Sequence, residues 1–420
     1  MMGRGEVRTQ MPSKTSYHPQ VTDVTGWTSE LDVVHARIAP RFERAEPRRR
    51  ALAYLHGLLS HVERKNGWQL AEEAGEQTPD GMQRLLHASH WDPDAVRADV
   101  VASIGAHLAD PAAILVIDES GFLKKGTKSA GVQRQYSGTA GKKENCQIGV
   151  FVTYSSLVPV PSQVLVDRDL YLPKEWADDL LRRQEAGIPE EVPFATKPEL
   201  ARGMLERLSA ADLPAAWVTG DTVYGGSGPL RHWLEDQRQP YVLAVASNDG
   251  VDVPWQGTHY HLPAGEMARH AVRAEQWQQL SAGHGSKGPR LYDWALVRLV
   301  PPQLSGFDQA LLIRRPLDVS DDPEELAKKL AYYLIFAPKG PLVETLVAVA
   351  GRRWTIEESF AAAKGAVGLD HYEVRHYHGW YRHITLAMLA LASLAVVRSR
   401  LTGSTAPEAK GGHLWLSSAS

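Results

Sequence analysis

The short apolar run at residues 113–117 (AILVI), which stops at Asp118, constrains the fold of this chain more than any other feature. An apolar run without polar alternation is typical of a strand that is covered on both faces. Further strand-like runs follow at 146–154, 158–166, 215–219 and 241–246, with helical patterns between them at 174–187, 197–209 and 227–237. Strands followed by alternating helices and strands predict an α/β fold with a mixed sheet.

The segment before this pattern, residues 21–110, is predicted to be an all-helical N-terminal domain. Apolar residues recur there at spacings of three and four, as in 52–62. Within it, 68–75 predicts a short helix, and Thr78 followed by Pro79 predicts the capped start of another. Two such helices are compatible with a DNA-binding helix-turn-helix and equally with two packed helices, so both interpretations stay open.

A second change of pattern interrupts the predicted core. Residues 247–345 contain short strands among turns rich in Gly and Pro, which predicts a β-rich insertion. Helical periodicity returns over 346–402, so the core is predicted to consist of two parts, 111–246 and 346–402. We expect disordered tails at 1–20 and 403–420, which are polar or rich in small residues.

Composition excludes several classes of protein. With 46 Lys and Arg against 49 Asp and Glu, the net charge of −3 excludes a histone-like protein that coats polyanions by bulk charge. The single cysteine, Cys146, excludes an intrachain disulfide scaffold and a Cys-rich zinc site. The start of the chain lacks the apolar core of a signal peptide, and the apolar run at 385–397 is shorter than the roughly 20 residues of a membrane span. We therefore expect a cytoplasmic protein with no membrane association.

Two aspartates stand where predicted strands end. Asp118 follows the first buried run, and Asp221 follows the run at 215–219. Ligand sites in α/β sheets form beyond the carboxyl ends of strands, so the two carboxylates could share one site. A single aspartate at such a position is more commonly a turn or helix cap.

A third acid lies on a late helix with basic residues on its own face. Spacings of four and seven place Arg353, Glu357 and Lys364 together. This pattern is compatible with an exposed helix carrying ion pairs, or with a carboxylate that binds a hard cation beside a phosphodiester. Oxygen-only ligands select Mg²⁺ or Mn²⁺, and two such ions about 3.5–4 Å apart support displacement at phosphorus. Glu358 is the competing acid, about 100° around the helix, and only Glu357 fits the spacing.

Taken together, these residues resemble the DDE transposases of bacterial insertion sequences. The subgroup of these transposases that the sequence resembles carries a Tyr-x2-Arg-x3-Glu-x6-Lys signature and a β-rich insertion before the glutamate. In this chain, Ala350 stands at the position of the tyrosine. The resemblance covers about residues 50–400 and extends to four further stretches, at 116–126, 134–138, 368–375 and 379–383.

The resemblance implies a ribonuclease H-like catalytic core in which Asp118, Asp221 and Glu357 hold Mg²⁺, with Mn²⁺ as a substitute. It implies a transposase that binds the terminal inverted repeats of its element, cleaves the DNA and joins the 3′-hydroxyl ends to target DNA. Arg353 and Lys364 would grip phosphates, and a homodimer is expected in the DNA complex, associated with the nucleoid. Two alternatives stay open: a catalytically silent, domesticated relative that binds DNA, and a ribonuclease H-like nuclease without strand transfer.

Basic residues outside the acidic triad indicate where DNA would lie. The segment 122–143 is rich in lysine and free of acids, although an unpartnered surface hairpin has the same composition. The segment 283–290 is expected to be a loop that carries basic residues, and the segment 375–383 mixes basic and aromatic residues. The four histidines at 371–383 do not have the spacing of a zinc site. The candidate DNA contacts in these segments are Lys124, Lys125, Lys128, Arg134, Lys142, Lys143, Lys287, Arg375 and Arg382.

Three tryptophans of the insertion are candidates for stacking on DNA. In related transposases, aromatic residues in this part of the chain receive a base that flips out of the element end. Trp255, Trp277 and Trp294 are the candidates here, and core packing is the alternative for each. The sequence does not choose among them.

Overall fold

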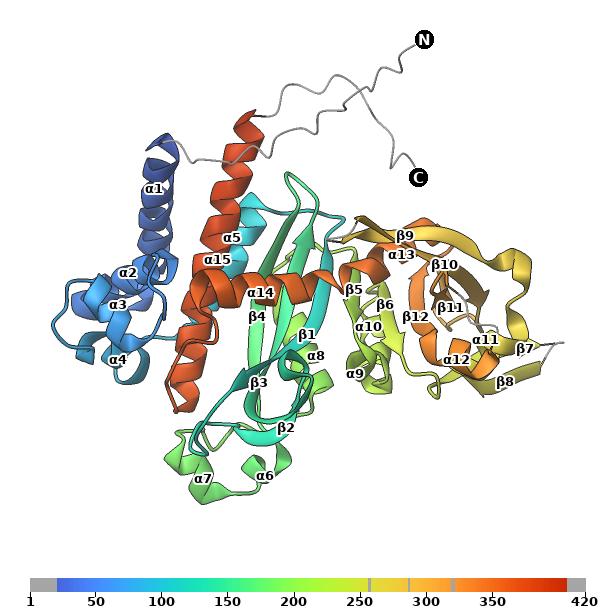
Figure 1. Cartoon of the computed structure of the whole chain (residues 1–420), viewed down its shortest axis with the longest axis horizontal. Coiled ribbons are helices and arrows are strands. Elements are labelled where there is room, and N and C mark those ends of the chain that lie inside the picture. Colours follow the sequence, from blue (N-terminus) through green and yellow to red (C-terminus); the bar gives the residue numbers. More distant parts are fainter. Residues whose placement is uncertain (1–20, 256–257, 286–287, 319–321, 406–420) are drawn as a thin grey trace, which may run out of the picture.

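A single large sheet runs through the protein (Figure 1). The computed structural model describes residues 21–405 except 256–257, 286–287 and 319–321. The strand order of the sheet is β2-β3-β1-β5-β6-β12-β11-β10-β9, and β4 also pairs with β3. The strands are β1 (Ile114–Leu123), β2 (Gln133–Ser137), β3 (Lys142–Ser156), β4 (Ser162–Tyr171), β5 (Trp217–Gly220), β6 (Tyr241–Val245), β9 (Gln278–Gly285), β10 (Gly288–Arg298), β11 (Phe307–Arg315) and β12 (Ala331–Pro338).

The central strands have the topology of a ribonuclease H-like core. β1, β3 and β4 form an antiparallel meander, and β5 and β6 then run parallel to β1. The predicted fold class is therefore confirmed. The buried strand β1 is longer than the apolar run indicated, because its second half pairs with β3 alone and tolerates polar residues.

The β-rich insertion extends this same sheet. β12 pairs antiparallel with β6, and β11, β10 and β9 follow outward. The segment expected to be a loop at 283–290 instead contains the end of β9 and the start of β10. The insertion also contains the hairpin of β7 (Gly250–Trp255) and β8 (Thr258–Pro263) and the helices α11 (Ala264–Ala271) and α12 (Pro323–Lys329).

Among the described residues, five α-helices precede the sheet, in the region that the sequence predicts to be helical. They are α1 (Val21–Ile38), α2 (Ala45–Leu59), α3 (Gly67–Glu73), α4 (Asp80–His87) and α5 (Pro93–His107). The predicted cap of α4 is wrong by one residue: Pro79 is the N-cap, and the Thr78 hydroxyl instead bonds the Asp80 carboxylate at 3.2 Å. Asn66 caps α3 by accepting from the Gln69 amide.

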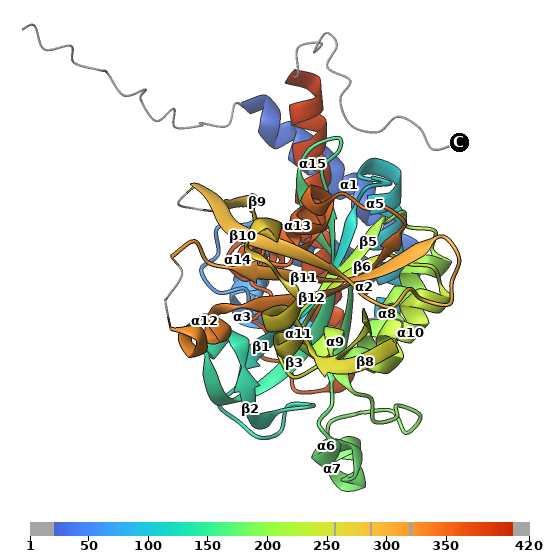
Figure 2. The ribbon, with the colours of Figure 1, turned by 90° about the vertical axis from the view of Figure 1, so that its right-hand side faces the viewer.

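Helices cover both faces of the core strands. Figure 2 shows α14 on one side of β1 and β3, and α8 and α10 on the other. The predicted helix at 174–187 is divided in two because Asp179 caps a second helix there. The α-helices that follow β4 in the chain, apart from α11 and α12 of the insertion, are α6 (Lys174–Ala177), α7 (Leu180–Glu185), α8 (Lys197–Ala210), α9 (Thr222–Gly225), α10 (Gly228–Asp236), α13 (Val343–Arg352), α14 (Thr355–Val367) and α15 (Tyr377–Thr405).

The long helix α15 contains the apolar run at 385–397. It is long and apolar enough to cross a membrane, but 67% of its apolar window is buried inside the protein. It packs on α5 and β4, and Ile384, Ala387 and Met388 are fully buried. Since α15 continues to Thr405, the predicted tail at 403–420 begins too early; its remainder and the tail at 1–20 lie outside the described residues.

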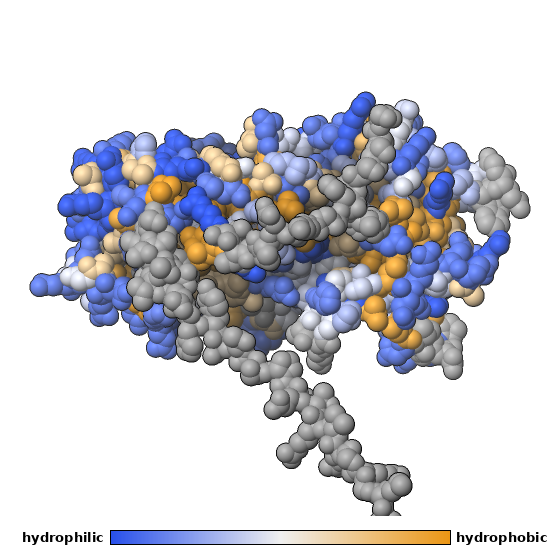
Figure 3. Space-filling view, turned by 90° about the horizontal axis from the view of Figure 1, so that it is seen from above, coloured by the Kyte–Doolittle hydropathy of each residue, from blue (hydrophilic) through white to orange (hydrophobic). Residues whose placement is uncertain are grey.

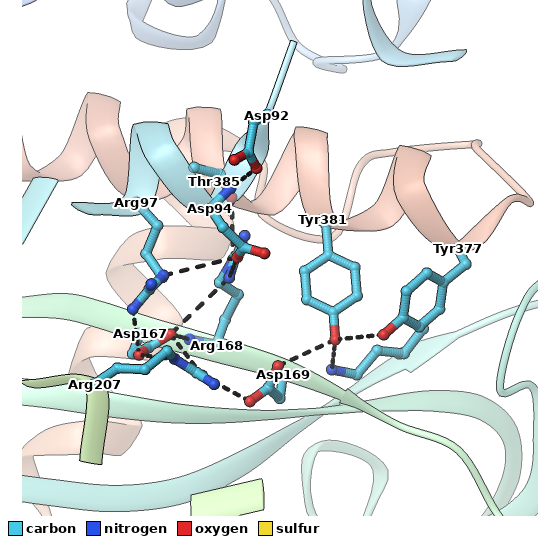
Figure 4. Close-up of polar contacts among 11 residues, drawn as sticks. Asp92, Asp94, Arg97, Asp167, Arg168, Asp169, Arg207, Tyr377, Tyr381 and Thr385 are labelled. Carbon is cyan, nitrogen blue, oxygen red and sulfur yellow. Dashed lines mark hydrogen bonds and ion pairs between the residues drawn. The ribbon is translucent and has the colours of Figure 1, made fainter. Parts of the chain in front are cut away.

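A buried ionic network ties the outer strand β4 to three helices (Figure 4). The fully buried Asp167 carboxylate accepts from Arg97 of α5 at 2.7 Å and from Arg207 of α8 at 2.9 Å. Arg207 also reaches Asp169, which accepts from the Tyr381 hydroxyl of α15 at 3.1 Å. The network therefore joins the N-terminal helices, the sheet and the C-terminal helix.

The surface is hydrophilic over much of its area, with apolar patches between. Figure 3 shows such patches at the right-hand end, where the insertion lies. The large exposed apolar residues of the insertion include Tyr260, Leu291 and Leu317.

Candidate active site and nucleic-acid interface

The register of the parallel strands places Asp118 and Asp221 side by side. Ile117 pairs with Gly220 as the last pair between β1 and β5, and the two aspartates are the next residues on each strand. The expectation that Asp118 ends its strand is wrong, since β1 continues to Leu123 along β3. It is the parallel pairing of β1 with β5 that ends just before Asp118. Beyond this point the two strands are no longer hydrogen-bonded to each other, which leaves room for a ligand between them.

Each of the two carboxylates accepts a local backbone hydrogen bond. Asp118 Oδ1 accepts from the Glu119 amide at 2.8 Å, and Asp221 Oδ1 accepts from the Val223 amide at 2.9 Å, which makes Asp221 the N-cap of α9. Among the described residues, no Lys, Arg or His forms an ion pair with either carboxylate. Their negative charges are therefore not neutralised by direct contact.

The electrostatics follow from this crowding of acids. Burial, then Asp221 and Glu119, raise the pKa of Asp118 to about 7. Burial and then Glu119 likewise raise the pKa of Asp221. The positive charge of Arg353 lowers both pKa values, but less than the other causes raise them. A divalent cation would stabilise such a pair of half-buried, repelling carboxylates.

Glu357 lies on α14, which crosses the sheet next to this pair. The helix is docked on β1 at one end, because Lys364 Nζ donates to the Gly121 carbonyl at 3.3 Å. At its other end, Arg353 occupies the joint between α13 and α14 and acts on both aspartates. Glu357 is exposed between these two points. In the described part of the chain, no three His, Cys, Asp or Glu side chains converge on one metal position, so Glu357 does not join the pair here.

A small pocket next to Arg353 is lined by arginines and aromatic rings. Its volume is about 160 Å³, and it lies between β10, β11 and the α13–α14 joint. Arg314 lies over the Tyr292 ring at 4.6 Å, and Trp354 is 48% exposed. Ala350, which replaces the tyrosine of the signature, lines the same pocket and leaves it open. Such a lining suits a planar, negatively charged ligand.

The basic segment forms an antiparallel β2–β3 ribbon with several exposed cations. Arg134 and Tyr136 alternate outward on β2, and Tyr136 pairs in register with Lys143. Lys125 is exposed as well. Two other exposed lysines of the ribbon form ion pairs within the chain: Lys128 with Glu185, and Lys142 with Glu144.

The structure contradicts one predicted DNA contact, Arg382, and engages a second, Lys124, within the chain. Arg382 is buried, and its guanidinium group donates to the carbonyl oxygens of Leu86, Ser89 and Trp91, so it joins α15 to the N-terminal helices. Lys124 lies over the Tyr372 ring at 3.4 Å and donates to the Tyr372 carbonyl, and burial lowers its pKa to about 8. The Arg382 guanidinium group is therefore not available to phosphate, and the Lys124 ammonium group is held by Tyr372.

The remaining sequence candidates fall into separate places. Arg375 is exposed, and Lys287 lies outside the described residues, as does the side chain of Trp255. Trp294 is 1% exposed and packs in the core, whereas Trp277 lies under Arg315 at 4.2 Å.

The four histidines of 371–383 lie in three separate places, and only His376 and His378 are neighbours. His383 is fully buried and bonds the Tyr54 hydroxyl at 2.8 Å, whereas His376 and His378 lie near His87 of α4. His371 instead accepts from the Lys65 amide.

Sequence reasoning missed residues on both sides of the aspartate pair. Glu119 bonds Lys197 at 2.6 Å and the Tyr224 hydroxyl at 2.8 Å, directly next to Asp118. Arg290 and Arg314 reach the pocket from the insertion. The sequence could have indicated Glu119 and Tyr224 as site residues, because they lie next to Asp118 and close to Asp221 in the chain. The contacts made by Lys197 of α8 and by the arginines of the insertion depend on tertiary structure.

Comparison with known proteins identifies the family to which this chain belongs. The model of the DDE superfamily endonuclease matches residues 37–289, and that of the transposase DDE domain matches residues 195–393. The first match includes Asp118 and Asp221, and the second includes Asp221 and Glu357. A probable transposase for insertion sequence element IS701 from Microchaete diplosiphon is 25% identical over 329 residues, which cover 78% of this chain and 77% of that protein. The chain therefore belongs to the DDE superfamily of endonucleases and transposases.

Proposed function

We propose that this protein is the transposase of an insertion sequence: it binds the terminal inverted repeats, cleaves the DNA there and joins the 3′-hydroxyl ends to target DNA. The observation that carries the proposal is the placement of Asp118 and Asp221 directly after the last parallel pair of β1 and β5. The similarity to the IS701 transposase supports the same activity.

Divalent metal ions are the cofactors that this site suits. Enzymes of the DDE superfamily generally use them, and two half-buried carboxylates without a contacting cation fit Mg²⁺ or Mn²⁺. When bound, such ions supply the charge that activates a water or 3′-hydroxyl nucleophile and stabilises the leaving oxygen. We propose that Asp118 and Asp221 hold the ion and that Glu357 completes the set when DNA is bound. Such tightening is common between a free enzyme and its substrate complex.

The DNA strand would pass from the β2–β3 ribbon to the pocket beside Arg353. Arg134 and Lys143 are exposed on the ribbon and suit contact with phosphates. The pocket offers Arg314, Arg353 and the half-exposed Trp354, which suit a phosphate and a stacked base. Arg375, Lys125 and Lys287 remain candidates for further phosphate contacts. A homodimer would hold the two ends of the element together, and the reaction would take place at the bacterial nucleoid.

The test is an incubation of the purified protein with Mg²⁺, a labelled duplex carrying the terminal repeat that flanks its gene, and a supercoiled target. We expect cleaved and joined products from the wild type and none from Glu357→Gln, with end binding unchanged. Glu358→Gln is the matched control, since this acid is equally exposed one residue further along α14, and it should cleave as the wild type does.

Three results would redirect the proposal. Cleavage without joining under Mg²⁺ or Mn²⁺ would indicate a nuclease. Binding without cleavage would indicate a silent DNA-binding relative. Loss of cleavage in Glu358→Gln but not in Glu357→Gln would show that the third acid is misassigned.

A further inference from the structure

Three polar residues form a hydrogen-bonded cluster beside the aspartate pair, and the proposed chemistry does not use them. Lys197 Nζ lies 2.6 Å from Glu119 Oε1, and the Tyr224 hydroxyl donates to Glu119 Oε2 at 2.8 Å. Tyr224 is fully buried, and the Lys197 and Glu119 side chains are 22% and 19% exposed. Both oxygens of Glu119 are therefore bound by partners on other elements.

The positions of these residues in the chain link the two aspartates. Glu119 follows Asp118 on β1, and Tyr224 is on the short helix α9, one turn after Asp221. Successive residues of a strand point to opposite faces of the sheet. Asp118 interacts with Arg353 at the α13–α14 joint, whereas Glu119 bonds α8 and α9; α8 lies on the other side of β1 (Figure 2).

The Tyr224 hydroxyl is held in a defined position because α9 packs closely against β6. A Cβ at Gly225 would lie 1.8 Å from the Ala244 carbonyl oxygen of β6, so only glycine permits this approach. The Tyr224 side chain packs on Gly220, where an added Cβ would lie 3.3 Å from it. The bond from Tyr224 to Glu119 therefore connects β1 to a segment that is held in place by β6.

We propose that Tyr224 and Lys197 are positioning residues that act through Glu119 to hold Asp118 and Asp221 at the separation a shared divalent ion requires. The parallel ladder ends with Ile117 and Gly220, so it does not restrain the aspartates themselves, and their mutual repulsion pushes them apart. The Tyr224–Glu119 bond opposes that separation, and Lys197 neutralises the third acid of the group. Outer partners of this kind commonly tune metal affinity by about 10- to 100-fold. The inference rests on the proposed metal site.

The matched test compares Tyr224→Phe with Tyr241→Phe in the full chain. Tyr241 is also buried, at 2% exposure, and its hydroxyl donates to a carboxylate, Glu235 Oε1, at 2.6 Å away from the aspartates. Mn²⁺ binding is measured directly from the free-ion signal in electron paramagnetic resonance. We expect the Mn²⁺ dissociation constant to rise about tenfold in Tyr224→Phe and to stay at the wild-type value in Tyr241→Phe.

A second pair of variants tests the lysine. Lys197→Met should weaken Mn²⁺ binding as Tyr224→Phe does. Lys197→Arg should restore part of the affinity, because it keeps a positive charge beside the Glu119 carboxylate. Cleavage by Tyr224→Phe should approach the wild-type rate at saturating Mn²⁺, which a general loss of folding would not permit.

Asp118→Asn separates the two hypotheses. If this variant binds Mn²⁺ like the wild type, the proposed metal site is wrong. If it loses binding while Tyr224→Phe keeps wild-type affinity, only the positioning role is overturned. An equal loss in Tyr224→Phe and Tyr241→Phe would also overturn it, since the effect would then come from any buried tyrosine.

Discussion

Lys364 donates a hydrogen bond from Nζ to the carbonyl oxygen of Gly121 at 3.3 Å, and this contact fixes the glutamate helix α14 on β1 three residues after Asp118. The same ammonium group lies 5.7 Å from the centre of the Phe122 ring. A residue expected to grip DNA phosphate is therefore also part of the scaffold that places Glu357. Its loss should affect the alignment of the site as well as DNA binding.

Replacing this lysine tests its structural part. We expect Lys364→Met to lower the free energy of unfolding by about 1.5–3 kcal/mol, because a hydrogen bond from a charged donor to the Gly121 carbonyl oxygen is lost. Urea denaturation measures the change, with the exposed Lys339→Met as the control. Equal stability of the two variants would show that Lys364 serves DNA binding alone.

Removing one of the repelling acids should stabilise the metal-free protein. Asp118 is ionised at pH 8 at a cost, since its pKa is raised to about 7 by burial and neighbouring acids. Asp118→Asn removes this cost, so unfolding in EDTA at pH 8 should require about 1–3 kcal/mol more than in the wild type. Added Mg²⁺ should stabilise the wild type and not the variant in a thermal melt. A variant that melts below the wild type in EDTA would refute the repulsion.

The arginine-lined pocket predicts a contribution of stacking to DNA binding. Trp354→Ala should weaken binding of the element end by about 1–3 kcal/mol, the usual worth of one stacked base. Fluorescence anisotropy with a labelled duplex measures it. Tyr260→Ala, which removes another half-exposed aromatic residue of the insertion, should bind like the wild type. Similar affinities for both variants would exclude the pocket from the DNA path.

The network around Asp167 predicts a large loss of stability away from the site. Asp167→Asn should cost about 3–5 kcal/mol, because Arg97 and Arg207 would then be left without their shared buried counter-charge. The control is Glu206→Gln on α8, the helix that carries Arg207, because the ion pair of Glu206 with Arg202 is half exposed and worth at most about 1 kcal/mol. Chemical denaturation compares them, and a loss below that of the control would contradict the prediction.

Acid should destabilise the protein through His383. Complete burial lowers the pKa of His383 from its ordinary value of 6.5 to about 3. A lowered folded-state pKa means that the unfolded chain takes up a proton first as the pH falls. Stability from this group is therefore complete above pH 6.5 and declines towards pH 3, by about 1.4 kcal/mol per pH unit.

The measurement is urea denaturation at intervals between pH 7 and pH 4. We expect His383→Gln to start from a lower stability and to have a shallower dependence on pH than the wild type. Identical slopes would assign the acid sensitivity to other groups.

Much of the chemistry was visible in the sequence because it depends on local pattern. The apolar run before Asp118 and the second run before Asp221 predict neighbouring strands, and the family's helix signature selects Glu357 over Glu358. The strand at 158–166 was misplaced, since Pro159 and Pro161 lack the amide that a ladder needs and β4 starts at Ser162.

The errors concern residues whose character depends on what covers them. Arg375 and Arg382 are equivalent in sequence, yet one is exposed and the other is bound by three buried carbonyl groups. Lys124 and Lys125 are neighbours, and only the first packs on Tyr372. Periodicity does not report which face of a helix or ribbon a distant segment will cover.

By itself, the sequence determined the α/β class, the helical start and the β-rich insertion, and it singled out the three acids as candidates, because hydrophobic period and residue spacing are local properties. Only the tertiary structure decided that the insertion extends the core sheet through β6 and β12, and that Glu119, Lys197 and Tyr224 meet beside Asp118. These contacts join segments far apart in the chain. They form because packing of the whole sheet, rather than local preference, sets which edges and faces meet.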